Sequence, residues 1–97
     1  MLFAVRFYDR PERVDVRKHL LNVHLEWLRV HSNVILAGGS LRPDLECDAI
    51  GALWIVQCES KSFIEDLLRT DPFWVHGLRK RYEIHYWHKA FPEQIAI

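Results

Sequence analysis

The sequence contains little cysteine, no net charge and no long apolar run, and each of these features excludes a class of protein. Its two cysteines, Cys47 and Cys58, lack the spacing of metal ligands, so neither a disulfide framework nor a zinc site is expected. Reduced thiols are typical of the cytoplasm, which is the predicted location. The apolar run Met1–Val5 is interrupted by Arg6; it is too short for the core of a signal peptide or for a membrane span. We therefore expect no membrane partner.

Motifs that hold nucleic acids, metals or phosphates are also missing. Thirteen Lys and Arg residues balance thirteen Asp and Glu residues, whereas a general nucleic-acid binder carries an excess of positive charge. His85 and His88 lie three apart in a predicted strand, so they face opposite sides and cannot share one ion. Gly38-Gly39 belongs to neither of the common glycine-rich phosphate loops. We predict no metal ion, no organic cofactor and no nucleic-acid partner.

The hydrophobic pattern divides the 97 residues into alternating strands and helices, without a linker or repeat. Residues 2–8 alternate as a half-buried strand does, and residues 13–32 repeat apolar positions with helical spacing. Ser60 is a candidate N-cap for a second helix. The expected elements are a strand at Leu2–Tyr8, a helix at Arg13–Ser32, a short strand at Val34–Ala37 leading into Gly38-Gly39, a loop at Ser40–Ile50, a strand at Gly51–Cys58, a helix from Glu59-Ser60 to just before Asp71-Pro72, a connector at Phe73–Leu78 and a strand at Arg81–Phe91.

This β-α-β-β-α-β order predicts an α+β, ferredoxin-like domain spanning residues 1–97, with an antiparallel sheet and both helices on one face. The other face would carry Tyr8, Trp54 and Trp87. An uncovered aromatic face usually meets another subunit or a ligand, so we expect a homodimer through the open sheet face. The RNA-binding RRM module has the same order, but residues 50–57 lack its basic residue and its stacking aromatic pair.

His24 is the first of two candidate site residues. At about 100° per residue, it lies in the middle of the apolar stripe of the first helix, among leucines and Trp27. A histidine there points to the core, where it can bond to backbone or to a buried carboxylate and serve stability alone. A functional histidine needs a group that tunes it and a cavity beside it. Arg17 and His31, seven residues away on either side, are expected to line a groove edge or to reach solvent.

Asp71, the second candidate, opens the turn Asp71-Pro72-Phe73. Asp before Pro commonly begins a turn, and its carboxylate accepts hydrogen bonds from the following backbone amides. The same carboxylate would gain a chemical role if the fold brought it to His24. An imidazole and a carboxylate in a low-dielectric pocket form a general acid–base pair. The structural and the catalytic interpretation both remain open at this point.

The order and spacing of several short motifs resemble the YCII-related (YciI-like) family over Met1 to about Phe91. The matching segments are His24-Leu25 on the first helix, Ala37-Gly38-Gly39-Ser40-Leu41, the strand from Gly51, Asp71-Pro72-Phe73, Gly77-Leu78 and a closing strand that ends in aromatic residues. The chain departs from the family where Gly39-Ser40 replaces a frequent Gly-Pro, and where His88 and Lys89 stand near the position of a common proline.

The resemblance implies a ferredoxin-like monomer that forms a dimeric α+β barrel through its sheet. It also implies an acid–base site in a small cavity, with the family's proposed active pair at His24 and Asp71. In the few family members with a known activity, the chemistry resembles dehydrochlorination of a hydroxylated aromatic.

The resulting hypothesis is a small enzyme for proton abstraction with elimination or isomerisation of a small, flat, partly apolar molecule. His24 would be the base and Asp71 its orienting partner, with Asp71 as the acid in an alternative scheme. Two other interpretations remain open. One is a non-catalytic ligand-binding or accessory module of the same fold. The other is an oxygen-using monooxygenase, which would require a substrate that activates oxygen itself.

Overall fold

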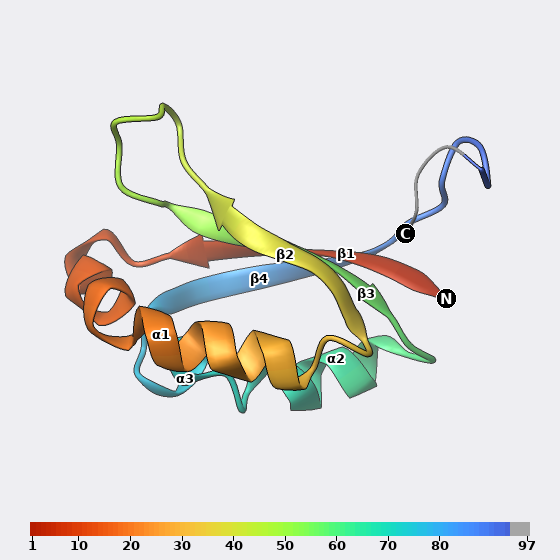
Figure 1. The fold of residues 1–97 in the computed structure, drawn as a ribbon, viewed down its shortest axis with the longest axis horizontal. Coiled ribbons are helices and arrows are strands. Elements are labelled where there is room, and N and C mark those ends of the chain that lie inside the picture. Colours follow the sequence, from red (N-terminus) through yellow and green to blue (C-terminus); the bar gives the residue numbers. More distant parts are fainter. Residues whose placement is uncertain (94–97) are drawn as a thin grey trace.

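A computed structural model describes residues 1–93 and confirms the predicted α+β, ferredoxin-like order (Figure 1). The elements are β1 (Leu2–Asp9), η1 (Pro11–Arg13), α1 (Val14–Val30), β2 (Ile35–Leu41), β3 (Gly51–Gln57), α2 (Lys61–Leu68), α3 (Pro72–Val75) and β4 (Arg79–Tyr86). Four strands form one sheet in the order β2-β3-β1-β4, and every neighbouring pair is antiparallel. The helices lie together on one side of this sheet (Figure 1).

The register of the sheet decides which side chains meet the helices. Val5 is opposite Trp54 on β3 and Ile84 on β4, and directly opposite residues share a face. The core forms on this face, where strand side chains pack against α2 and, in part, α1. Its buried members are Phe3, Val5, Phe7, Ile35, Ala52, Trp54, Val56, Ile64 and Leu68.

Two strands end more than one residue away from the expected position, and the pairing of their neighbours explains both. β2 continues through Gly38 and Gly39 to Leu41 because β3 pairs with it along this whole stretch. β4 ends at Tyr86 rather than Phe91, since β1, its neighbour in the sheet among residues 1–93, begins at Leu2. The carbonyl of Leu2 accepts a hydrogen bond from the amide of Trp87 at 3.0 Å, and β1 offers no residue beyond it.

The helical segments follow the predicted pattern with one addition. Ser60 caps α2 as expected, because its hydroxyl accepts a hydrogen bond from the amide of Phe63 at 3.2 Å. The segment expected to be a plain connector contains the short helix α3. Of the helices within residues 1–93, none combines the length and the apolar character that crossing a membrane requires.

The open face of the sheet is not the aromatic surface that was expected. The prediction for Trp54 was wrong: its pairing with Val5 turns it toward the helices, where it is fully buried. Trp87 follows β4 instead of lying within it, so it is not part of the strand that was expected to carry it. Tyr8 does lie on the open face, where the guanidinium groups of Arg6 and Arg81 are 4.1 and 3.7 Å from its ring centre.

The open face instead has two parts of different chemistry. We call the first the apolar half; it is a shallow hollow over β2 and β3. Its lining residues are Ala37, Gly38, Gly39, Ser40, Leu41, Leu53 and Ile55. We call the second the charged half; it lies over β1 and β4 and comprises Arg6, Tyr8, Arg81 and Glu83.

Candidate active site

Asp71 is held in place by its position at the start of α3. Its backbone is extended, and its Oδ1 atom accepts a hydrogen bond from the amide of Phe73 at 3.1 Å, as the turn motif predicts. Pro72 occupies the first turn of the helix, where its missing N–H costs nothing. Asp71 is only 1% exposed, so its carboxylate is fixed inside the protein.

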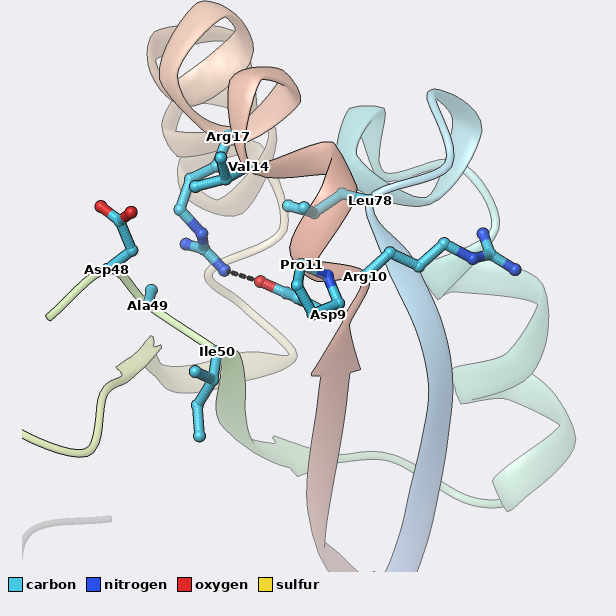
Figure 2. A pocket seen from close by; sticks show the side chains of 9 residues that line it. All are labelled: Asp9, Arg10, Pro11, Val14, Arg17, Asp48, Ala49, Ile50 and Leu78. Atoms are coloured by element: carbon cyan, nitrogen blue, oxygen red, sulfur yellow. Dashed lines mark hydrogen bonds and ion pairs between the residues drawn. The ribbon is translucent and has the colours of Figure 1, made fainter.

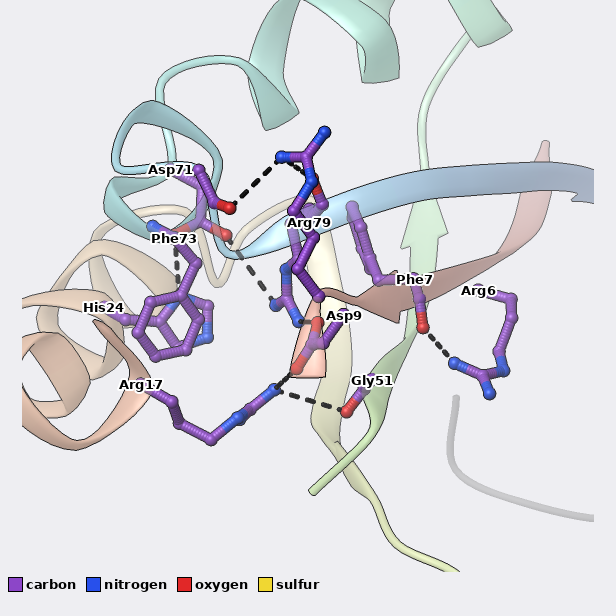
Figure 3. Close-up of polar contacts among 11 residues, drawn as sticks. Arg6, Phe7, Asp9, Arg17, His24, Gly51, Asp71, Phe73 and Arg79 are labelled. Atoms are coloured by element: carbon purple, nitrogen blue, oxygen red, sulfur yellow. Dashed lines mark hydrogen bonds and ion pairs between the residues drawn. The ribbon is translucent and has the colours of Figure 1, made fainter. Parts of the chain in front are cut away.

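His24 contacts this carboxylate directly. Its Nδ1 atom lies 2.7 Å from Asp71 Oδ1 (Figure 3). The imidazole is 5% exposed and stacks on the Phe73 ring at a centroid distance of 4.0 Å and an interplanar angle of 14°. Because an ionised carboxylate only accepts hydrogen bonds, we assign the proton to Nδ1. This assignment leaves a lone pair on Nε2, and stacking fixes the plane in which it points.

Asp71 also belongs to a buried charge cluster, which we define as Asp9, Arg17, Asp71 and Arg79. Asp9 accepts hydrogen bonds from Arg17 Nη2 at 2.6 Å and from Arg79 Nη1 at 2.8 Å. Arg79 Nη2 lies 3.9 Å from Asp71 Oδ2 (Figure 3). Two arginines and two aspartates give the cluster no formal net charge while His24 is neutral.

Arg79 is the most enclosed cation of this cluster, with no side-chain exposure. Burial lowers its pKa, and the Asp9 carboxylate opposes that effect. An arginine normally stays charged in proteins, so the cost of enclosing the charge is offset by its two carboxylate neighbours. Its guanidinium also packs 4.6 Å from the ring centre of Phe7 and 5.2 Å from that of Phe73.

A cavity of about 330 Å³ adjoins His24, a volume at the lower end of those that bind small molecules. It lies between α1 and the β2–β3 side of the sheet. Asp71 contacts His24 but does not line the cavity. The lining residues are Val14, Arg17, Lys18, Leu21, His24, Leu25, Leu28, Gly38, Gly39, Ser40, Arg42, Asp48, Ala49, Ala52 and Trp54. A second cavity of about 170 Å³ shares Val14, Arg17, Asp48 and Ala49 with it (Figure 2).

One wall of the larger cavity depends on a glycine. A Cβ atom at Gly38 would lie 3.2 Å from Cδ1 of Trp54, closer than an ordinary van der Waals contact. The indole of Trp54 therefore lies beneath a strand that lacks a side chain at this point. Its Nε1 atom is buried and has no hydrogen-bond partner, which leaves an unused donor in this wall.

The structure brings His24 and Asp71 together, and it adds Asp9 and Arg79, which the sequence did not suggest. Arg17 lines the cavity, one of the two places expected for it, whereas His31 packs against Trp27 at a centroid distance of 4.6 Å. Across residues 1–93, no three His, Cys, Asp or Glu side chains are grouped so as to hold a metal ion.

Similar solved structures share this fold. The 5-chloro-2-hydroxyhydroquinone dehydrochlorinase TftG from Burkholderia phenoliruptrix AC1100, in complex with 2,5-dihydroxybenzoquinone, is 27% identical, with a TM-score of 0.81 over 91% of this chain and 94% of that one. A putative antibiotic biosynthesis monooxygenase from Bacteriodes thetaiotaomicron VPI-5482 is 15% identical (TM-score 0.57, 96% and 91% covered). Another antibiotic biosynthesis monooxygenase is 16% identical (TM-score 0.51, 95% and 100% covered). The last two similarities concern the fold alone.

Sequence comparison identifies the family. No curated protein matches the sequence of this chain. The model of the YCII-related domain matches residues 1–88, which include both His24 and Asp71 and every strand of the sheet. The chain therefore belongs to the YCII-related domain family.

Proposed function

We propose that this protein is a small enzyme that uses His24 and Asp71 for acid–base chemistry on a small hydroxylated aromatic molecule. The observation that carries the proposal is the 2.7 Å contact between His24 Nδ1 and Asp71 Oδ1, made by a histidine that also lines a cavity of about 330 Å³. A core histidine that served stability alone would need the carboxylate but not the cavity.

The proposed reaction is a proton abstraction followed by elimination or isomerisation. His24 Nε2 takes a proton from a carbon or hydroxyl of the ligand, and Asp71 holds the Nδ1–H and offsets the positive charge of the imidazolium. In an elimination, the ring reacts as its keto tautomer, in which the carbon that bears the leaving group also carries a hydrogen. His24 takes a hydroxyl proton, the electron pair of the O–H bond forms a C=O bond, the adjacent ring double bond shifts, and the leaving group departs with the electrons of its own bond. In an isomerisation, the imidazolium returns the proton to another atom. An alternative assigns the acid step to Asp71.

The similarity to TftG supports an aromatic ligand. That protein is a dehydrochlorinase of 5-chloro-2-hydroxyhydroquinone, and its structure holds 2,5-dihydroxybenzoquinone. Removal of a proton and a chloride from a ring is a reaction for which one positioned base and a largely apolar cavity suffice. Positioned acid–base catalysis contributes typically ~10²–10⁴-fold to a rate, which sets the size of the effect to test.

We further propose that the protein acts in the cytoplasm as a homodimer joined through the open face of its sheet. The apolar half supports this proposal, because Leu53 is 39% exposed there and no element within residues 1–93 covers it. A symmetric dimer would place the same surface of both subunits in contact.

The experiment is a chloride-release assay with 5-chloro-2-hydroxyhydroquinone, run on the wild type and on His24→Gln. Glutamine keeps a polar side chain of similar length but cannot act as a base, so we expect a loss of at least ~10²-fold in turnover. The matched control is His19→Gln, which changes an exposed histidine on the same helix and should keep the wild-type rate.

Two results would overturn the proposal. Wild-type turnover in His24→Gln would show that His24 is not the base. Binding of the aromatic without chloride release or ring-proton exchange would favour the alternative, a ligand-binding module that performs no chemistry.

A further inference from the structure

Trp54 carries a polar group that the proposed proton transfer does not use. Its side chain is fully buried on β3 and lines the larger cavity. Its Nε1–H has no hydrogen-bond partner within residues 1–93, although the large majority of buried side-chain polar groups in proteins are bonded. Because an indole N–H can only donate, any partner that it takes is an acceptor.

The neighbouring strand leaves space beside this donor. Gly38 on β2 is opposite Trp54, and directly opposite residues share a face of the sheet. A Cβ atom at Gly38 would lie 3.2 Å from Cδ1 and 3.7 Å from Nε1 of Trp54, and 3.7 Å from Cγ2 of Ile35. We call the space that this atom would fill the Gly38 recess. An oxygen atom is smaller than a methyl group, so it fits in the recess at the distance of a hydrogen bond to Nε1, about 2.9–3.0 Å.

The Gly38 recess and the proposed base belong to one site. His24, Gly38 and Trp54 all line the larger cavity. The Trp27 ring lies beside both other rings, with centroid distances of 6.4 Å to His24 and 5.5 Å to Trp54. Trp27 uses its own Nε1–H in a 3.0 Å hydrogen bond to Thr70. A flat ring that presents one oxygen to His24 can therefore present another to Trp54.

The surroundings of the donor favour a carbonyl oxygen over a hydroxyl. A carbonyl accepts hydrogen bonds and carries no proton. A hydroxyl would bring a proton of its own, and the side chains that border the Gly38 recess, Ile35 and Trp54, offer no acceptor for it. Since the indole N–H makes no bond to residues 1–93, a ligand carbonyl gains this bond without breaking one inside the protein.

We propose that Trp54 is a specificity-determining residue, which donates its Nε1–H to a carbonyl oxygen on the ring of the ligand. The proposal rests on the proposed function and deepens it, because the keto tautomer from which the elimination starts carries such an oxygen. His24 exchanges the proton at one edge of the ring, while Trp54 holds the carbonyl at another. The ligand is then a quinonoid or keto ring rather than a ring with hydroxyls alone.

The test is an NMR titration of the isotope-labelled protein with two neutral flat rings. Tropone carries one carbonyl and no hydroxyl, and phenol carries one hydroxyl. We expect tropone to move the Nε1–H resonance of Trp54 downfield, as a new hydrogen bond does, and phenol to move it less. The resonance is identified by its absence in Trp54→Phe. A purely structural role of Trp54 would not produce this shift.

Trp54→Phe removes the donor and keeps an aromatic ring in the core. The affinity for tropone should fall at least about ten-fold, whereas the affinity for phenol should change by at most about two-fold. The matched control is Trp27→Phe, because the N–H lost there is bound to Thr70. This control should alter the affinity for tropone by at most about two-fold.

Gly38→Ala tests the Gly38 recess without changing Trp54. The added methyl group occupies the recess, so the affinity for tropone should again fall about ten-fold. Gly39→Ala is the matched control, because a Cβ atom there would have no neighbour within 4 Å among residues 1–93. It should weaken binding by at most about two-fold. If Trp54→Phe does not fold, Gly38→Ala and the wild-type resonance still decide the matter.

Three results would overturn this inference: no binding of tropone, an Nε1–H resonance that does not respond to it, or equal losses for both probes in folded Trp54→Phe. The outcome is separable from that of the chloride assay. His24→Gln should lose turnover yet keep the binding of tropone that depends on Trp54. A protein that turns over its substrate through His24, but binds tropone equally well with and without the indole N–H, would refute this inference alone.

Discussion

Arg79 and Arg81 lie two residues apart on β4, yet they end on opposite faces of the sheet. Arg79 is fully enclosed between Asp9 and Asp71 on the helix-covered face, while the Arg81 side chain is 54% exposed on the open face. The cause is a shift of register between Tyr8 and Asp9 on β1: Arg79 is opposite Asp9 and Arg81 is opposite Tyr8. Lys80 is thus an extra residue in the ladder, and a bulge of this kind redirects the neighbouring side chains.

The two faces of the sheet accommodate charged side chains in different ways. On the helix-covered face, each charge of the buried charge cluster has an opposite charge within 4 Å, because an unpaired buried charge is very costly. On the open face, charges lie at the surface, and no element within residues 1–93 covers the apolar half. The chain completes its first face alone, and we propose that a second copy completes the other.

The largest effect expected from this comparison is on stability. Arg79→Met removes the shared cation and leaves Asp71 without a positive neighbour in the core, so we expect a loss of about 3–5 kcal/mol in the free energy of unfolding. Arg81→Met removes an exposed cation of the same strand and should cost less than about 1 kcal/mol. Urea unfolding at equal subunit concentrations measures both variants. Similar losses in the two variants would contradict the contrast between the faces.

An intermediate effect is expected on association through the open face. Leu53→Glu places a charge in the apolar half, and burying it in an interface would be unfavourable. We expect the dimer dissociation constant to rise at least about ten-fold, which corresponds to ~1.4 kcal/mol. Analytical ultracentrifugation over a range of concentrations measures it, with Val23→Glu on the exposed side of α1 as the matched control. A monomeric wild type, or equal effects of the two variants, would refute the dimer.

The smallest effect concerns a hydrogen bond of the charged half. The Tyr8 hydroxyl donates to Glu83 Oε1 at 2.7 Å, and this bond lowers the pKa of Glu83. A lowered folded-state pKa adds stability that is fully present above the unfolded value of about 4.3 and is lost as the pH falls through the folded value. In Tyr8→Phe, the pKa of Glu83 should rise, and the free energy of unfolding should fall less steeply with acid than in the wild type.

NMR titration of the Glu83 carboxyl carbon measures this shift directly. The matched bond on the helix-covered face joins the Tyr82 hydroxyl to Glu65 Oε2, also at 2.7 Å. Tyr82→Phe should therefore leave the titration of Glu83 as it is in the wild type. A Glu83 pKa that does not respond to Tyr8→Phe would show that the bond does not form in solution.

Local signals in the sequence were sufficient for the order of elements and for one half of the candidate site. Apolar spacing placed His24 on the inner stripe of its helix, and the Asp71-Pro72 pair marked a turn whose carboxylate accepts a backbone hydrogen bond. Both depend on interactions within a few residues. Their mutual contact spans 47 residues, and it was predictable only as a consequence of the fold and of the family resemblance.

The parts that were not predictable depend on register. The nearly continuous apolar run of β3 does not reveal which side Trp54 faces, and only its pairing with Val5 decides this. Arg79 carried no signal, because strict alternation would place it on the same face as Arg81, and the bulge reverses that. Asp9 lies at the end of β1, and the sequence alone indicates only that the strand ends there. The buried charge cluster therefore becomes visible only when two distant parts of the sequence, residues 9–17 and residues 71–79, are brought together.

The most direct test of the central claim, that the His24–Asp71 pair serves the cavity beside it, is a crystal structure of the protein with 2,5-dihydroxybenzoquinone. We expect the ring between α1 and β3, with one of its atoms within hydrogen-bond reach of His24 Nε2, about 2.6–3.2 Å, and His24 Nδ1 still bound to Asp71. A ring bound elsewhere on the protein, with His24 in contact with protein atoms alone, would contradict it.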